Sequence, residues 1–409
     1  MRKNNILLAI TTLFATIVGL YVIPQFVRLA TESPDDYPYV QYSSGLKELV
    51  ILNFGDEERN VLSTESSATY TEAQGDSLLP IFNFYQLMAK GQQPDSIEGM
   101  EVNMQIIRTG STIFRHEPSE VNSLREPLHT LFEAMPRRGG LKVPSDLFRL
   151  DDKIEFIDAQ SNTVDKAKSA LFQDMLVKRG YTFPSQWNIG NPNPRKSYDE
   201  GYFSLDADGD LFHIKMVNSR PYIRDTKVGD SVEIAHFAIY EVPNKRFYGF
   251  VYSRDGGVYI LEEGYHLLKL DIPSFDIYNE QMLIVGNILY WTITITNDEG
   301  RKYYALRNSD LSQVDRYSIS RTENRWDMAT KYLLPTYIML QGERDELNYP
   351  RLRFGGCRSF VFSLVLAVGY FIFRRKSALT SRLFASLLIL LTGVAGLLAV
   401  LLLPLNTKK

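Results

Sequence analysis

Three aspartates at alternating positions are the first residues whose spacing could support chemistry. Asp206, Asp208 and Asp210 resemble the start of a calcium loop, in which carboxylates converge on a hard cation. The rest of the pattern is missing, because an EF-hand requires Gly at its sixth position and Glu at its twelfth, where Leu211 and Val217 stand. We therefore interpret the segment as a hairpin turn built on Asp-Gly chemistry.

The histidines carry little catalytic or metal-binding signal. No two of them have the spacing of a paired metal ligand such as His-Glu-x-x-His. His116 precedes Glu117, so an acid–base role is conceivable, but no nucleophile in a recognisable turn stands nearby. Gly-x-Ser-x-Gly and the glycine-rich phosphate and dinucleotide motifs are absent. The sequence therefore predicts no catalytic, cofactor-binding or metal-binding residue, the histidines included: His116, His129, His213, His236 and His266.

Aromatic residues in the second half offer another possible chemistry, the stacking of sugar rings. They are Tyr248, Phe250, Tyr252, Tyr259, Tyr290, Trp291, Tyr303 and Tyr304. Aromatic residues in such alternating patterns are more often the core and the cross-strand pairs of sheets. A glycan-binding surface is thus one alternative function.

Three apolar segments predict that the chain is anchored in a membrane. Residues 5–26 are long and apolar enough for a membrane anchor, and Arg2 and Lys3 keep the N-terminus in the cytoplasm. The alternative is a cleaved signal peptide, but no convincing pair of small residues follows the apolar run. Two further spans are predicted at residues 355–373 and 383–404, although the first of them could also be a re-entrant helix.

The basic segment 374–382 orients the chain, because cytoplasmic loops are rich in Lys and Arg. We expect it to lie in the cytoplasm of a bacterial cell and the region between the first and second spans to lie in the periplasm. A cytoplasmic part this small cannot hold an ATPase or a kinase. Multi-pass insertion in the inner membrane, with the lipid bilayer as a partner, is the expected localisation.

Residues 31–190 read as an extracytoplasmic α/β domain. A strand is expected within 45–54, and Thr71 begins a capping box that opens a helical stretch ending at Gly91. A helix is expected over 164–179, with Thr163 as its N-cap and Gly180 as its stop.

Residues 198–345 read as a β-rich domain, separated from the first by the Pro- and Asn-rich segment 190–196. Three hairpins are expected around Gly209, Gly256 and Gly300, which lie 47 and 44 residues apart (256 − 209 and 300 − 256). This period is close to that of a propeller blade. Because closure needs at least four blades, the candidates are a partial propeller, to which the first domain could add strands, and an open β-meander or sandwich.

Composition excludes one class of partner. The chain has 409 residues and a formal net charge of −3, without the basic stripe that a nucleic-acid partner would require. Its single cysteine, Cys357, lies at a membrane boundary, so no disulfide holds the extracytoplasmic part together. The overall expectation is a membrane-anchored α+β protein.

Several runs of the sequence are similar to an uncharacterised family of Gram-negative inner-membrane proteins with a domain of unknown function. They are residues 76–82, 86–88, 94–96, 106–109, 198–209 and 211–218. The resemblance implies a periplasmic domain and an association with ABC transporters, and it provides no catalytic residue to assign.

These features favour a non-enzymatic accessory, sensor or assembly subunit of a membrane complex, with an ABC exporter as the expected complex. An integral membrane protein is the expected partner, and the ligand is unknown. The alternatives are an envelope hydrolase that acts on glycan or peptide and a glycan-binding surface module.

Overall fold

The computed structural model describes residues 2–32, 37–54, 59–136, 139–341 and 348–403. The chain forms two compact units. A helical unit combines the two ends of the chain, up to Tyr37 and from Ser320 onward, and a β-rich unit comprises Pro38–Ile319. The protein is therefore α+β, with an apolar N-terminal helix and a body of several sheets.

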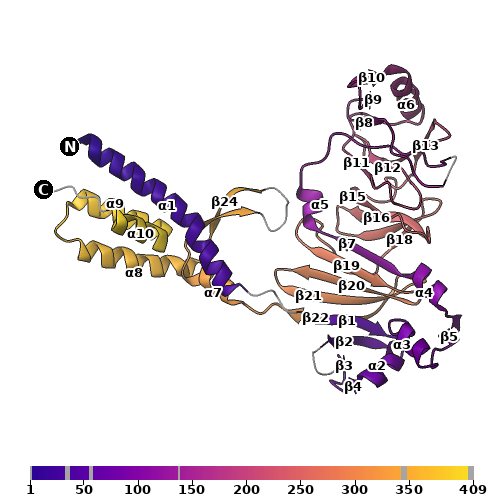
Figure 1. Ribbon diagram of the computed structural model, residues 1–409, viewed down its shortest axis with the longest axis horizontal. Helices are drawn as coiled ribbons and strands as arrows, with labels where there is room; N and C mark the ends of the chain where they lie inside the picture. The colour runs from indigo at the N-terminus through magenta and orange to yellow at the C-terminus, as the bar shows by residue number, and fades with distance from the viewer. Residues whose placement is uncertain (1, 33–36, 55–58, 137–138, 342–347, 404–409) are drawn as a thin grey trace. The chain divides into compact units, whose positions relative to one another are not determined.

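Four antiparallel meanders of four strands dominate the described part of the β-rich unit (Figure 1). One contains β1 (Tyr39–Ser43), β2 (Glu48–Phe54), β3 (Arg59–Ser63) and β4 (Thr69–Thr71). The next contains β11 (Trp187–Gly190), β12 (Tyr202–Leu205), β13 (Leu211–Val217) and β14 (Arg220–Asp225). It is followed by β15 (Ile234–Ile239), β16 (Phe247–Ser253), β17 (Val258–Glu262) and β18 (Leu267–Lys269). The last contains β19 (Gln281–Gly286), β20 (Tyr290–Asn297), β21 (Gly300–Arg307) and β22 (Gln313–Ser320).

The predicted hairpins are the central hairpins of three of these meanders. Gly209 lies between β12 and β13, Gly256 between β16 and β17, and Gly300 at the start of β21. All three have positive φ, of 92°, 86° and 141°, a backbone conformation that glycine adopts without steric penalty. The segment 190–196 begins at the last residue of β11 and precedes β12, and these two strands pair within one sheet.

Early segments of the chain also contribute strands to this array. Besides the meander β1–β4, the short strand β7 (Thr112–His116) pairs with β19 and extends the last sheet to five strands. Phe114 lies opposite Ile284 in this register.

Aromatic contacts show how neighbouring sheets pack face to face. Phe203 of β12 and Phe237 of β15 have ring centroids 4.3 Å apart, and Tyr42 of β1 and Tyr290 of β20 have centroids 4.4 Å apart. A third buried cluster surrounds Trp291, between the sheets β15–β18 and β19–β22. Burial of apolar surface between the sheets is therefore the main source of stability of this unit.

Helices and short strands cover the ends of the array. Near β1–β4 are α2 (Glu72–Leu78), α3 (Phe84–Ala89), β5 (Ser96–Ile97), β6 (Met100–Glu101) and α4 (Met104–Gly110). Beyond β11–β14 are β8 (Asp146–Leu150), β9 (Ile154–Asp158), β10 (Thr163–Asp165) and α6 (Lys166–Lys178). The capping box at Thr71 is present as predicted, with reciprocal hydrogen bonds to Gln74.

The N-cap of α6 differs from the expectation. Thr163 belongs to β10, because it pairs with Asp158 of β9. The helix therefore begins after Asp165, whose carboxylate accepts a hydrogen bond from the backbone N–H of Lys168 at 3.0 Å. The predicted stop is confirmed, since Gly180 has a φ of 88°.

The helical unit contains α1 (Arg2–Thr31), α7 (Arg325–Tyr332), α8 (Cys357–Phe373), α9 (Leu379–Thr392) and α10 (Val394–Leu402), with the hairpin β23 (Thr336–Gln341) and β24 (Asn348–Phe354). Among the described residues, Ile6–Thr31 is the helix long and apolar enough to cross a membrane, and a signal sequence would pass the same test. The apolar helices α8 and α9 are shorter.

The last apolar segment is not the single helix expected over 383–404. It is broken at Gly393, whose φ of 60° and ψ of −129° lie outside the helical region, so α9 and α10 are separate helices. A side chain at this position would meet Pro335 at 2.9 Å, which explains why glycine stands there. Ser386 of α9 donates a hydrogen bond to the Ala367 carbonyl of α8 at 3.2 Å.

Candidate functional site

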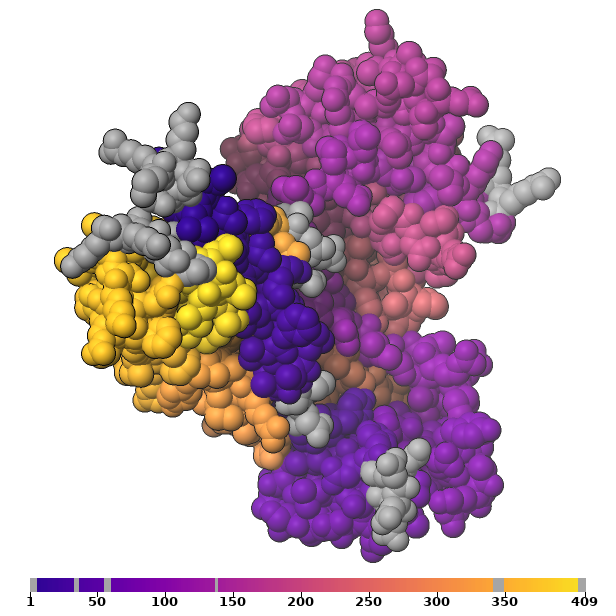
Figure 2. Space-filling model, turned by 60° about the vertical axis from the view of Figure 1, so that its left-hand side comes forward, coloured from indigo at the N-terminus to yellow at the C-terminus, as the bar shows by residue number. Residues whose placement is uncertain are grey.

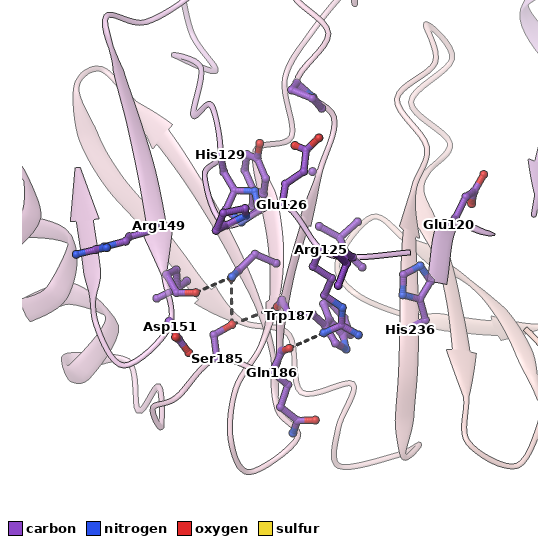
Figure 3. A pocket seen from close by; sticks show the side chains of 18 residues that line it. Glu120, Arg125, Glu126, His129, Arg149, Asp151, Ser185, Gln186, Trp187 and His236 are labelled. Atoms are coloured by element: carbon purple, nitrogen blue, oxygen red, sulfur yellow. Dashed lines mark hydrogen bonds between the residues drawn. The ribbon is translucent and has the colours of Figure 1, made fainter. Parts of the chain in front are cut away.

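A cavity of about 560 Å³ in the β-rich unit combines polar and aromatic side chains (Figure 3). One side is formed by β11 and the residues just before it, and another by the segment after α5 (Pro118–Asn122). His236 of β15 and Arg149 of β8 complete the lining. The cavity therefore lies where segments from several sheets converge, as is usual for ligand pockets.

Two of the scattered histidines, His116 and His236, lie close together, and His236 also lines this pocket. The rings of His116 and His236 have centroids 6.5 Å apart. The centroid of the Tyr252 ring lies 5.1 Å from that of His116 and 6.1 Å from that of His236. His116 Nδ1, His236 Nδ1 and the Tyr252 hydroxyl are all buried without a hydrogen-bond partner among the described residues. Buried polar groups are normally paired, so this cluster is a polar feature that packing alone does not explain.

The hydrogen bonds of His116 fix its tautomer. Nε2 donates to the Ile277 carbonyl at 2.9 Å, which leaves Nδ1 without a proton, 3.7 Å from a carboxylate oxygen of Glu120. Burial lowers the pKa of His116, against the opposing effect of the hydrogen bond to Ile277. The imidazole is therefore neutral near pH 7.

Burial also lowers the pKa of His236 to about 3, with smaller contributions from His116 and Arg125. Arg125 donates a hydrogen bond to the Gln186 carbonyl at 2.5 Å. Within the described residues no carboxylate forms an ion pair with it, and partial burial lowers its pKa. A partly desolvated guanidinium without a counter-ion thus stands next to a neutral buried imidazole.

The floor of the pocket is a closed hydrogen-bond network. Asn188 donates to the Leu150 carbonyl at 2.8 Å and accepts from Ser204 at 2.7 Å, while Ser185 lies 3.2 Å from the Asn188 amide oxygen. Tyr181 bonds to Ser204 at 2.6 Å. Because Ser185 is engaged in this network, it is not positioned as a nucleophile beside a base.

The aspartate loop has a structural role. Asp206 is fully buried and accepts hydrogen bonds from the backbone N–H groups of Thr182, Asp208 and Asp210, at 3.0, 3.0 and 2.8 Å. The segment is a hairpin turn held by one carboxylate. Across the described residues no group of three or more His, Cys, Asp or Glu side chains is arranged to hold a metal ion.

The other histidines lie apart from the pocket or at its border. His213 is buried between the Tyr265 hydroxyl at 2.9 Å and the Glu200 carbonyl at 2.6 Å, and burial lowers its pKa to about 3. His129 lines the pocket, with its pKa lowered to about 4 by burial. His266 is exposed.

Most of the aromatic residues considered for sugar stacking belong to the core. Phe250, Tyr252, Tyr290, Trp291, Tyr303 and Tyr304 are buried. Their rings pack between sheets, so these six do not form a surface platform for glycans. The ring of Trp187 does line the pocket, 6.1 Å from His236.

Sequence reasoning missed Arg125, Trp187 and His236 as a group. These residues come from a loop and two different sheets, and no spacing along the chain marks them. The sequence did draw attention to His116, because Glu117 follows it, but this histidine lies beside His236 and does not line the pocket.

Comparison with known proteins gives one family match. The model of a domain of unknown function, DUF4857, matches residues 39–306. No curated protein matches the chain. Among solved structures, the chain is similar to PorZ, described as an essential bacterial surface component of the type-IX secretion system of Porphyromonas gingivalis, with 11% identity and a TM-score of 0.22.

That match covers 72% of this chain and 34% of PorZ, so the chain spans about a third of that relative. A second similar structure is the dihydro-heme d1 dehydrogenase NirN in complex with DHE, with 10% identity, a TM-score of 0.27, and coverage of 66% of this chain and 67% of NirN. Both TM-scores are too low to support a conclusion about fold or function.

Proposed function

Because the chain belongs to the DUF4857 family of domains of unknown function, we propose a function from its own architecture. The protein is a non-enzymatic, membrane-anchored accessory, sensor or assembly subunit. Its helical unit inserts in the inner membrane, and its β-rich unit lies in the periplasm, where it binds a ligand or a partner protein.

The observation that carries this proposal is the packing of α1 on the C-terminal helices. Figure 2 shows the indigo N-terminal helix beside the yellow C-terminal segment. Thr12, Thr16 and Leu20, one turn apart, are buried, and Gly19 faces Ala395 of α10. A cleaved signal peptide would not need a matching surface on the far end of the chain, so the packing favours a retained anchor.

Exposed apolar side chains of the helical unit support insertion in lipid. On α1 they include Ile6, Leu7, Ile10 and Phe14, and on α8 Val361, Leu364, Val365, Val368 and Ile372. A soluble protein rarely exposes so large an apolar surface. In a bilayer the same surface faces acyl chains.

The break at Gly393 modifies the expected topology. At 1.5 Å per residue, α9 rises about 21 Å and α10 about 13 Å, both less than the roughly 30 Å of a hydrocarbon core. We infer that α9 and α10 enter the bilayer as a broken pair, packed on α8 and α1. The basic segment 374–382 keeps the turn between α8 and α9 in the cytoplasm.

Reporter fusions test the topology. Alkaline phosphatase fused after residue 200 is expected to be active, and the same enzyme fused after residue 378 is expected to be inactive. Active fusions at both positions would refute the cytoplasmic turn. N-terminal sequencing of the membrane-extracted protein tests the anchor, since a mature chain that starts near Thr31 would exclude it.

Purification in a mild detergent tests the role in a complex. We expect a membrane partner to co-purify, and the resemblance to the uncharacterised family suggests that this partner is an ABC exporter. Recovery of the chain alone, from cells that express it at its natural level, would count against an accessory role.

A further inference from the structure

We propose that the pocket beside β11 binds a small organic acid with an apolar body, whose carboxylate or phosphate group pairs with Arg125 and forms a hydrogen bond with His236. This inference goes beyond the membrane-anchored role and rests on the pocket of the β-rich unit alone. It would hold whether or not the helical unit spans a bilayer.

Arg125 supplies the charge that selects an anion. The pocket contains a second arginine, Arg149, but its guanidinium pairs with the carboxylate of Glu155 at 2.7 Å. Arg125 bonds instead to a backbone carbonyl, that of Gln186, and forms no ion pair within the described residues. A planar guanidinium has five N–H donors, so most of those of Arg125 remain available for a carboxylate or phosphate.

His236 supplies a neutral polar contact next to this charge. It lines the pocket although only 8% of the residue is exposed, and its Nδ1 is buried without a partner. Figure 3 shows His236 and Arg125 at the same end of the cavity, with Arg149 and Asp151 at the other end. A neutral imidazole carries one N–H, which an anionic oxygen accepts without a second positive charge.

Apolar side chains define the rest of the ligand. Trp187, Leu150, Ile189 and Pro127 line the same cavity. Its volume of about 560 Å³ lies in the range of pockets for small molecules. Because Glu126 and Asp151 also line it, a second acidic group elsewhere on the ligand would be repelled. The pocket therefore fits an acid with one anionic group and an apolar body.

Calorimetric titration of the purified full chain tests the proposal with three probes that share a phenyl body. Phenylacetate carries a carboxylate, phenyl phosphate carries a phosphate, and phenylacetamide is the neutral match of the first. We expect saturable binding of at least one anion and about tenfold weaker binding of phenylacetamide. The tighter of the two anions identifies the acidic group.

Arg125→Gln is expected to weaken binding of the anion about tenfold, whereas the matched control Arg149→Gln, in the same pocket, is expected to bind normally. In the wild-type chain, the bound anion is expected to protect Arg125 from phenylglyoxal, as read by peptide mass spectrometry. This second readout does not depend on the folding of a variant.

Three results would overturn the proposal: no saturable binding of either anion, equal binding of phenylacetamide, or equal binding by Arg125→Gln. Failure of the topology fusions would leave the titration result unchanged, so the two proposals are tested separately.

Discussion

Gly19 of α1 and Ala395 of α10 are in direct contact across the helical unit. A Cβ atom built on Gly19 would lie 3.2 Å from the Cβ of Ala395, closer than ordinary van der Waals contact. The two residues are 376 positions apart (395 − 19), so this contact joins the beginning and the end of the chain. Small residues at such a crossing let two helices approach closely in a membrane.

Gly19→Leu is therefore expected to separate α1 from α10. Overpacking of a tight contact typically destabilises by about 1 to 3 kcal/mol. The melting temperature in detergent should fall, as measured by intrinsic fluorescence. Gly369→Leu on α8 is the matched control, because a Cβ there would meet nothing within 4 Å. Equal melting temperatures of the two variants would contradict the α1–α10 contact.

Lys196→Met is expected to destabilise the β-rich unit strongly. The ammonium group lies 2.5 Å from Asp199 and 2.8 Å from Glu241, and all three side chains are almost fully buried. Removing the ammonium group leaves two buried carboxylates without this partner, which is expected to lower the free energy of unfolding by about 3 to 5 kcal/mol. Thermal unfolding of the variant measures the loss.

The same variant should recover stability in acid. Burial raises the pKa of the Asp199 and Glu241 carboxyls, so both take up protons more readily than exposed acids as the pH falls. Lys227→Met, which removes an exposed ammonium group paired with Asp225, is the control and should change the melting temperature far less. A loss of stability that is equal in both variants would show that the buried group is unimportant.

Gly201→Ala should cost more stability than Gly209→Ala. Both glycines have positive φ, but a Cβ on Gly201 would lie 2.2 Å from the Ile214 carbonyl oxygen, whereas one on Gly209 would meet nothing within 4 Å. Backbone strain alone costs about 1 kcal/mol, and the clash adds to it at Gly201. Chemical denaturation of both variants gives the comparison, and a larger effect at Gly209 would refute it.

Stability should fall as the pH drops below about 6.5. His213 is neutral in the folded protein, because burial lowers its pKa to about 3, and the unfolded chain binds a proton at the usual pKa of histidine. The unfolded state therefore binds more protons between these two values. By linkage, the contribution of His213 to the free energy of unfolding is complete above the pKa of the unfolded chain. It is lost as the pH falls toward about 3, by about 1.4 kcal/mol per pH unit.

His213→Gln should flatten this pH dependence, because glutamine has no titrating group. Melting temperatures at several pH values between 4 and 7 would show the change in slope. His266→Gln, a change at an exposed histidine, is measured alongside to show the effect of the substitution itself. An unchanged slope in His213→Gln would show that other groups dominate acid unfolding.

Local features of the sequence predicted local structure well. Thr71 and Gln74 stand three residues apart, and a capping box needs no information from elsewhere in the chain. The same holds for the turn glycines. By contrast, Thr163 lost its expected role as an N-cap because a neighbouring strand paired with it, a tertiary effect that a local pattern does not contain.

The family-like run around residues 198–209 illustrates a different limit. The resemblance assigned no role to its charged residues, and in the structure Asp199 pairs with buried Lys196, and Glu200 pairs with Lys215 at 2.6 Å. The pocket residues, in contrast, had no sequence signal. His116 and His236 meet only because β7 and β15 belong to sheets that pack against each other.

The pairing of β7 with β19 also constrains the order in which the protein can be assembled. During synthesis, residues 112–116 emerge long before residues 281–286, and α1 similarly precedes α10. Both β7 and α1 can pack only after their partners in the second half of the chain have been synthesised. Contacts between distant segments form slowly, so the nascent chain exposes the unpaired edge of β7 until residues 281–286 have been made.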